Sequence, residues 1–165
     1  MSTNIKKLNK GFTIIEVLIV LAIAGLILAI VFLAVPALQR NSRNTAIRSD
    51  AAGVLAAVND YIANNQGGLP LTTSSPQTGP TICIGTGSGA TCPGGASEAK
   101  VRGGTSVQFA SGGSAAATTT GTIIVRFNVK CNGNNFSGTS APRAVAAGFL
   151  IESTSANTAP QCIES

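Results

Sequence analysis

A long apolar stretch near the N-terminus constrains this chain more than any other feature. From Phe12 to Leu38 the only charged residue is Glu16, and the next charge is Arg40. A helix needs about 20 apolar residues to cross a bilayer, so this stretch is long enough. A charged side chain inside such a span costs roughly 2.5–3.5 kcal/mol on insertion scales, which makes Glu16 a candidate functional residue. The alternative is an ordinary membrane anchor whose carboxylate reaches the interface.

The residues around the start of the stretch form a specific motif. Lys6, Lys7 and Lys10 precede the run Gly-Phe-Thr-Ile-Ile-Glu-Val-Leu-Ile-Val-Leu, which begins at Gly11. This order resembles the class III leader and first helix of type IV pilins and of their relatives, the pseudopilins of type II secretion and competence systems. The resemblance covers roughly the first third of the chain, and residues 67–165 carry no comparable motif.

The resemblance implies a processing route and a set of site residues. A membrane prepilin peptidase and methyltransferase would cut between Gly11 and Phe12 and methylate the new N-terminus on Phe12. Thr13 and Glu16 would then lie beside that terminus, with Glu16 as the conspicuous acid used in filament assembly.

Physical chemistry suggests how such a carboxylate would act. Cleavage creates an amino cation on Phe12 at the positive end of a helix. A carboxylate in lipid is protonated or paired, and the N-terminus of a neighbouring helix offers a cation at only one vertical offset. Relief of desolvation favours that contact even if the ion pair adds little net stability. We therefore expect Glu16 to select the register between adjacent helices.

The apolar stretch is a poor match to a cleaved secretory signal peptide. A secretory signal peptide has a shorter apolar core and a small-residue cleavage site, and Ala34-Val35-Pro36-Ala37 is a poor version of that site.

The charges on either side of the stretch barely distinguish its two orientations. Three lysines precede the stretch and three arginines follow it closely, so the positive-inside rule favours neither side clearly. The arginines are Arg40, Arg43 and Arg48. The cysteines favour export of the C-terminal part.

The net charge does not indicate a nucleic-acid partner. The formal charge is +5, but three of the basic residues are the leader lysines, which would leave on cleavage. A nucleic-acid groove needs a clustered basic stripe with aromatic stacking partners. The remaining chain offers Tyr61 and scattered Phe residues, so nucleic acid is not expected as a direct, specific ligand.

Beyond Leu38 the pattern predicts that the helix continues to about Ile62. Apolar residues recur at three- and four-residue steps and form one stripe, whereas Asp50 and other polar residues fall largely away from it. The members of the stripe are Ile47, Ala51, Val54, Leu55, Val58, Tyr61 and Ile62. The run Asn64–Pro70, with two glycines and a proline, supplies the stop. The whole helix would have about 50 residues.

Gly25 and Pro36 interrupt this predicted helix. Proline removes one backbone hydrogen bond and bends or loosens the preceding turn. We expect a kink near the membrane boundary in the free subunit, and the resemblance implies that the stretch from Gly25 to Val35 melts on assembly.

From Leu69 onward the chain is rich in Gly, Ser, Thr, Ala and Asn, and its apolar residues are typical of strands. Thr122–Cys131 alternates, with Val125, Phe127, Val129 and Cys131 on one face, and Asn132-Gly133 after it is a hairpin-turn signal. Val145–Glu152 is a second strand and Val101–Phe109 a weaker third. Residues 72–99 and 110–121 are predicted as surface loops. We therefore predict an α+β fold, with a small antiparallel sheet on the stripe of the long helix.

The chain has four cysteines and no histidine. In an exported domain an even number favours disulfides. Three pairings are open, of which we favour Cys83–Cys92 across a loop and Cys131–Cys162 across the C-terminal part. The second bond would add ~3–4 kcal/mol by loop entropy. A zinc site needs close ligand pairs, which this chain lacks, so no metal is predicted.

Catalysis finds little support in the sequence. Histidine is absent, and the acids Glu98, Glu152 and Glu164 show no paired spacing. No Gly-x-Ser-x-Gly motif occurs. We predict no catalytic residue, no cofactor and no enzymatic activity.

These observations favour a type IV pilin subunit with four segments. Residues 1–11 are a cleaved leader, 12–38 the transmembrane and assembly segment, 39–66 the amphipathic exported half of the helix, and 67–165 a disulfide-bonded β domain. The expected partners are other copies of the chain, the prepilin peptidase and methyltransferase, the inner-membrane pilus assembly machinery and membrane lipid. The subunit would be a single-pass membrane protein first and part of an extracellular filament later. Two alternatives stay open: a pseudopilin, and an anchored surface-binding domain that never polymerises.

Overall fold

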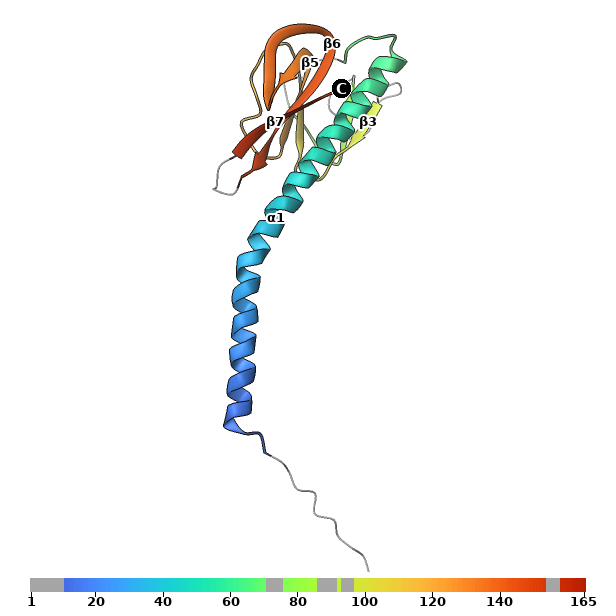
Figure 1. The fold of residues 1–165 in the computed structure, drawn as a ribbon. Coiled ribbons are helices and arrows are strands. Elements are labelled where there is room, and N and C mark those ends of the chain that lie inside the picture. The colour runs from blue at the N-terminus through green and yellow to red at the C-terminus, as the bar shows by residue number, and fades with distance from the viewer. Residues whose placement is uncertain (1–10, 71–75, 86–91, 93–96, 154–157) are drawn as a thin grey trace, which may run out of the picture. The chain divides into compact units, whose positions relative to one another are not determined.

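The computed structural model describes residues 11–70, 76–85, 92, 97–153 and 158–165. One long helix, α1 (Ile14–Asn64), is followed by strands (Figure 1). The strands are β1 (Gln77–Thr78), β2 (Thr81–Ile84), β3 (Ser97–Lys100), β4 (Ser106–Ser111), β5 (Thr122–Asn132), β6 (Asn135–Glu152) and β7 (Thr158–Glu164). The predicted α+β fold, with a long apolar N-terminal helix, is confirmed. The chain forms two compact units, residues 1–39 and residues 40–165.

Within the second unit, α1 buries the predicted stripe. Ala51, Val54 and Val58 have no exposed surface, and Ile47 and Leu55 have 8% and 5%. Tyr61 and Ile62 pack against the same core from its edge. These positions share one face because residues three and four apart are neighbours on a helix.

Asp50 is the exception, because it was expected to lie away from the stripe and is 8% exposed. One carboxylate oxygen accepts a 3.2 Å hydrogen bond from the backbone N–H of Arg102 and a 3.0 Å bond from the hydroxyl of Thr105. A buried carboxylate is tolerated when such donors satisfy it. Asp50 therefore fastens the 102–105 turn to the helix.

The helix ends where the sequence predicts. The N–H of Gly67 donates to the carbonyl of Ile62 at 2.8 Å, and that of Asn65 to the carbonyl of Tyr61 at 2.9 Å. Gln66 and Gly67 have φ values of 55° and 82°. A bond from Gly67 back to Ile62 combined with left-handed residues is a Schellman-type C-cap.

The main sheet has the strand order β1-β4-β5-β6-β7, and β2 and β3 form a separate antiparallel pair. The main sheet is mixed rather than purely antiparallel, because β4 runs parallel to β5. Alternation marks the faces of a strand but not its direction, so the sequence pattern could not reveal this pair. The connection between the two strands is tied to β5 by Arg126, whose guanidinium donates to the carbonyl oxygens of Gly112 and Ala115.

Several strand boundaries differ from the prediction. Residues 72–99 were predicted as a loop, yet β1, β2 and the start of β3 lie there. The predicted strand from Val101 is displaced to β4, and β7 was not predicted at all. These strands have two to seven residues each, and so few positions give only a weak sequence pattern, even where the side chains are buried as in β2.

The β5–β6 hairpin forms at Asn132-Gly133 as predicted, with Asn132 opposite Asn135 in the register and Gly133 at φ 61°. The strand β6 is longer than expected, because residues 135–144 also pair or extend along β5. Bulges shift the register around Val129. Arg143 and Asn128 both have positive φ, and the N–H of Arg143 donates to Oδ1 of Asn128 at 3.1 Å.

These bulges change which core Val129 joins. It was expected to share a face with Val125 and Phe127, but it packs with Phe136 and Ala146 in a second, smaller cluster. The ring of Phe136 lies directly on Gly148, where an added Cβ would come within 2.6 Å of a ring atom. The extra residues of these bulges lie in β6, where five positions separate Val145 from Ser140 opposite the two from Phe127 to Val129. In β5 the regular alternation of faces is interrupted at Asn128, whose φ is 62°.

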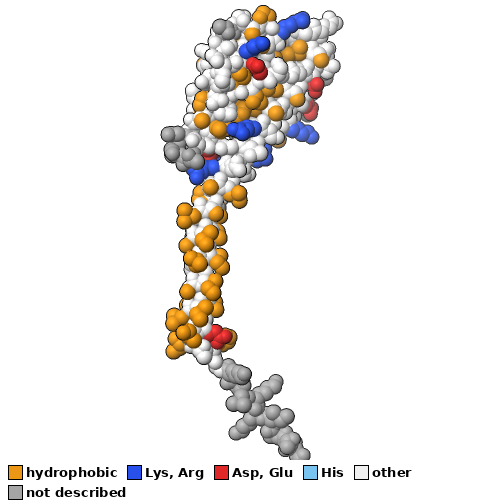
Figure 2. Space-filling view, in the orientation of Figure 1, with side chains coloured by type: hydrophobic (Ala, Val, Ile, Leu, Met, Phe, Trp, Pro, Cys, Tyr) orange, Lys and Arg blue, Asp and Glu red, His pale blue; other side chains and the backbone are white. Residues whose placement is uncertain are grey.

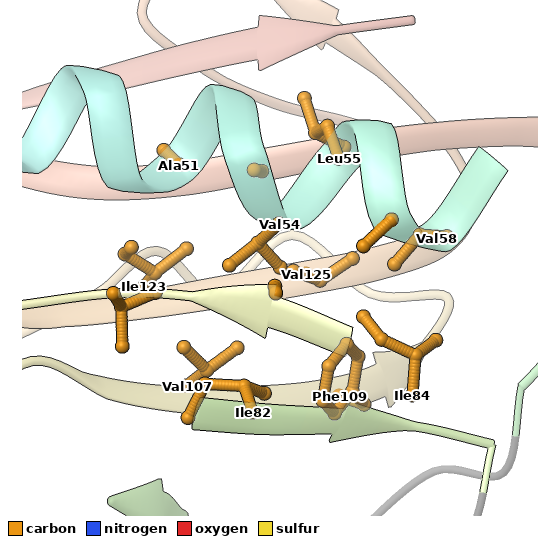
Figure 3. Close-up of a cluster of buried hydrophobic side chains, with 14 of the residues drawn as sticks. Ala51, Val54, Leu55, Val58, Ile82, Ile84, Val107, Phe109, Ile123 and Val125 are labelled. Atoms are coloured by element: carbon orange, nitrogen blue, oxygen red, sulfur yellow. The ribbon is translucent and has the colours of Figure 1, made fainter. Parts of the chain in front are cut away.

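The main core lies between α1 and the sheets. Figure 3 shows Val54 and Val58 of the helix close to Val125 of β5, with Phe109 and Ile84 beneath. Phe109 and Phe127 stack with ring centroids 6.3 Å apart. Residues 40–165 therefore bury their own apolar surface.

Candidate assembly and processing site

The first part of α1 leaves its apolar side chains uncovered. Within the described residues, every exposed large apolar side chain lies between Phe12 and Leu38, with exposed fractions from 41% at Val35 to 82% at Phe12. Figure 2 shows these side chains along the length of the helix. The most apolar 18-residue window has a mean hydropathy of 3.3, and none of it is buried. By length and composition, α1 is the one described helix that could cross a membrane.

The predicted processing residues lie at the start of this helix. Gly11, Phe12 and Thr13 precede the first helical residue, Ile14, and Phe12 is 82% exposed. The carbonyl of Thr13 accepts from the N–H groups of Glu16 at 3.1 Å and Val17 at 3.4 Å, so Thr13 occupies the N-cap position. The Gly11–Phe12 bond therefore lies in exposed backbone outside the helix.

Glu16 lies in the first turn of α1 and is exposed. With Thr13 at the N-cap, Glu16 is the third helical residue, where a carboxylate interacts favourably with the helix dipole. Phe12, Val17, Val20 and Leu21 line a shallow recess around it. The structure thus places the acid within an apolar face, beside the residue that would become the new terminus.

Gly25 and Pro36 both lie inside α1, and the helix continues through them without a break. No atom lies within 4 Å of the position that a Cβ on Gly25 would take. Glycine costs about 1 kcal/mol relative to alanine in a helix interior, and nothing within the subunit requires it. Pro36 removes the N–H that would otherwise bond to the carbonyl of Phe32.

The structure contains both disulfides in the pairing favoured from the sequence. Cys83–Cys92 closes a short loop with a sequence separation of 9, and Cys131–Cys162 spans 31 residues. Cys83 is fully buried, and the side-chain amide of Gln77 exchanges two 3.0 Å hydrogen bonds with its backbone. Cys131 lies near the end of β5, and Cys162 lies in β7, which pairs with β6. The bond therefore ties the last strand to the hairpin.

Sequence reasoning missed a clamp between the helix and the end of β6. Arg43 binds both carboxylate oxygens of Glu152, at 2.8 and 2.7 Å. The side chain of Asn44 adds two 2.8 Å hydrogen bonds to the backbone of Glu152. The hydrogen bonds and charge of Arg43 lower the pKa of Glu152, and the same contact raises that of Arg43. These residues are 108 and 109 positions apart, so no local pattern could reveal the contact.

The described part of the chain contains no group of three or more His, Cys, Asp or Glu side chains arranged to hold a metal ion. Its geometry is that of an exposed apolar helix with one acid, joined in sequence to a disulfide-bonded domain.

Comparison with protein families gives the class of this N-terminal site. Residues 6–32 match the family model of the prokaryotic N-terminal methylation motif. The chain thus carries the class III prepilin leader of type IV pilin-like proteins, which supports a pilin-like or pseudopilin-like protein. No curated protein and no solved structure gives a significant match.

Proposed function

We propose that this chain is the structural subunit of a type IV pilus, and that it polymerises through its N-terminal helix into a surface filament. The observation that carries the proposal is the uncovered apolar helix from Phe12 to Leu38, which begins within the matched methylation motif. This surface needs lipid before assembly and other copies of the same helix afterwards, because water is a poor environment for it.

Processing would precede assembly. A prepilin peptidase cuts after Gly11 and methylates Phe12, which removes the leader lysines and leaves an amino cation near Glu16. The carboxylate of Glu16 then pairs with the terminus of a neighbouring helix, because an unpaired charge in an apolar environment is costly. The inner-membrane assembly machinery lifts each subunit from the bilayer into the filament.

The disulfide-bonded unit, residues 40–165, would form the outer surface of the filament. Its buried core and two disulfides support this role, since it needs no neighbour to cover its apolar side chains. Adhesion, motility and DNA uptake are functions that such filaments serve.

Isolation of surface fibres tests the proposal. Electron microscopy and mass spectrometry of sheared fibres should show long filaments whose subunits begin at an N-methylated Phe12. Processed chain in short or absent fibres favours a pseudopilin. Unprocessed chain that stays in the membrane as single copies contradicts both and favours an anchored binding domain.

A further inference from the structure

A recess of about 320 Å³ opens on the second unit beside the first turns of its helical segment. One wall comes from α1 through Arg43 and Ile47, another from the turn at residues 102–105, and a third from Leu150 at the end of β6. Ile47 and Leu150 are each 8% exposed, so they give the recess an apolar floor.

The recess offers positive charge and open backbone. The side chain of Arg102 is exposed, and among the described residues no hydrogen bond or ion pair engages its guanidinium. Gly103 and Gly104 have no atom within 4 Å of a potential Cβ position, so a ligand can approach their backbone closely. Both carboxylates of the recess are already satisfied, Asp50 by Arg102 N–H and Thr105, and Glu152 by Arg43.

Chain length limits how far Arg43, in one wall of this recess, can lie from the apolar stretch. Arg43 follows Leu38, the last residue of the apolar stretch, by five residues. Five residues span about 7.5 Å as a helix and at most about 18 Å when extended, whatever the orientation of the two units. The headgroup layer is roughly 5–8 Å thick on each side of the hydrocarbon core. Residues 38–43 are helical, so the shorter spacing applies and Arg43 can reach the outer edge of this layer when residues 12–38 cross the bilayer.

We propose that this recess binds the phosphate of an anionic phospholipid headgroup while the subunit is held in the membrane. Arg102 provides the free guanidinium, whose planar N–H groups match phosphate oxygens, and Arg43 adds charge from the opposite wall. The inference rests on the membrane-anchored stage of the proposed function and is independent of polymerisation. None of the described lining residues is aromatic, which disfavours single-stranded nucleic acid, because its bases stack on aromatic rings.

The test uses the full chain in phosphatidylcholine nanodiscs, with ¹⁵N-labelled glycine and a rising fraction of phosphatidylglycerol. The amide signals of Gly103, Gly104 and Gly121 should shift and saturate. Arg102→Gln should weaken this binding about fivefold, as expected for one basic residue at an anionic surface. The fold should survive, because Asp50 bonds to the backbone of Arg102 and not to its side chain.

Two further variants make the test specific. Arg143→Gln is the matched control, since it removes the same charge from a side chain that does not line the recess and lies against Gly67, beyond the opposite end of the helical segment from Arg43. It should bind phosphatidylglycerol as the parent does. Glu152→Gln removes a negative charge and releases Arg43, so it should tighten the binding of phosphatidylglycerol. If the Arg43–Glu152 contact were merely structural, its loss would not tighten that binding.

The contrary outcomes are distinct. A chain that does not integrate into nanodiscs overturns both the anchored stage and this inference. A chain that integrates but whose glycine signals ignore phosphatidylglycerol, or whose Arg102→Gln and Arg143→Gln variants weaken equally, overturns the lipid site alone. Equal saturation by inorganic phosphate or by a DNA oligonucleotide in pure phosphatidylcholine nanodiscs also overturns it.

Discussion

Val20 and Val54 lie on the same helix, yet the first is 61% exposed and the second has no exposed surface. The sequence around each residue explains the contrast. Apolar residues surround Val20 on all sides of the helix, whereas around Val54 they follow one stripe between polar residues. A single stripe can be covered by one sheet, but a helix that is apolar all round needs lipid or several other helices.

The two parts of this helix thus differ in what covers them: the sheet covers the second part, and nothing in the described chain covers the first. Residues 40–165 bury their own core and can be disturbed without altering the apolar stretch. The apolar side chains of residues 12–38 are exposed and are not part of that core, and under the proposed function their surface serves lipid and other copies of the helix. Substitutions in the two regions should therefore have separable effects, and each of the following experiments tests that separation.

The largest effect is expected from Glu16→Ala. The substitution makes the stretch more apolar, so the chain should stay in the membrane. Selection of the register between adjacent helices should be lost, because the carboxylate is absent. Fibre yield should therefore fall about tenfold or more, which corresponds to about 1.4 kcal/mol or more per contact. Quantitative immunoblotting of sheared fibres and of membrane fractions measures the fibre yield and the amount of chain that stays in the membrane. Glu16→Gln keeps the size of the side chain, so it separates the effect of losing the charge from the effect of shortening the side chain.

Glu98→Ala is the matched control, since it removes an exposed carboxylate from β3 in the other unit. Its fibre yield should equal that of the parent. Normal fibres from Glu16→Ala would contradict the assembly role of the acid, and equal losses in both variants would show a general effect of charge.

The next effect concerns the disulfides of the second unit. Removal of Cys131–Cys162 by paired serine substitution should lower the free energy of unfolding by about 3–4 kcal/mol, and removal of Cys83–Cys92 by about 2–3 kcal/mol, because the first closes a longer loop. The separations are 31 and 9 residues. Thermal unfolding of the full chain in detergent micelles gives the comparison, and N-terminal mass spectrometry should show unchanged cleavage at Gly11. A reversed order of the two losses would mean that native packing outweighs loop entropy.

Much of this division could be predicted from the sequence. The stop after Asn64, the stripe from Ile47 to Ile62 and the strand from Thr122 are all encoded by local periodicity or by glycine and proline signals. The match at residues 6–32 is equally local. Such features are readable because each depends on residues that lie within a few positions of one another.

The missed features depend on contacts between distant residues. Asp50 looked solvent-facing because its partners, Arg102 and Thr105, are more than 50 positions away. Val129 changed clusters at the irregularity around Asn128, where the register with β6 also shifts, and an alternating pattern does not reveal such an irregularity. The role of Glu16 in assembly belongs to contacts between subunits, so it is predicted from sequence and chemistry rather than read from one chain.

A conservative pair of substitutions sharpens the contrast between the two parts of the helix. Val54→Ala deletes two methyl groups from the centre of the core and should destabilise the second unit by about 1.5–3 kcal/mol. Val20→Ala makes the same change at an exposed position and should leave unfolding of the second unit unchanged within about 0.5 kcal/mol. Denaturant unfolding of each full-length variant in detergent micelles measures both values. A substantial loss in Val20→Ala would show that residues 12–38 contribute to the core of the second unit.

The smallest effect is expected at the clamp near the start of the second unit. Arg43 lowers the pKa of Glu152 below the ordinary value of 4.5, so the folded state favours the ionised carboxylate. The clamp therefore stabilises the fold at pH values above the unfolded pKa of Glu152, and this contribution disappears as the pH falls through the lower folded pKa.

The stability of the parent and of Glu152→Gln, measured against pH, should differ slightly at neutral pH and become equal in acid. Added salt should also reduce the difference, because the pair lies at the surface. Glu98→Gln, which removes an exposed carboxylate with no ion pair in the described part of the chain, should show no such convergence. If the gap between the parent and Glu152→Gln stays constant across the acid range, the clamp acts through its backbone bonds to Asn44 and through packing, and the charge of Arg43 adds nothing to the stability of the fold.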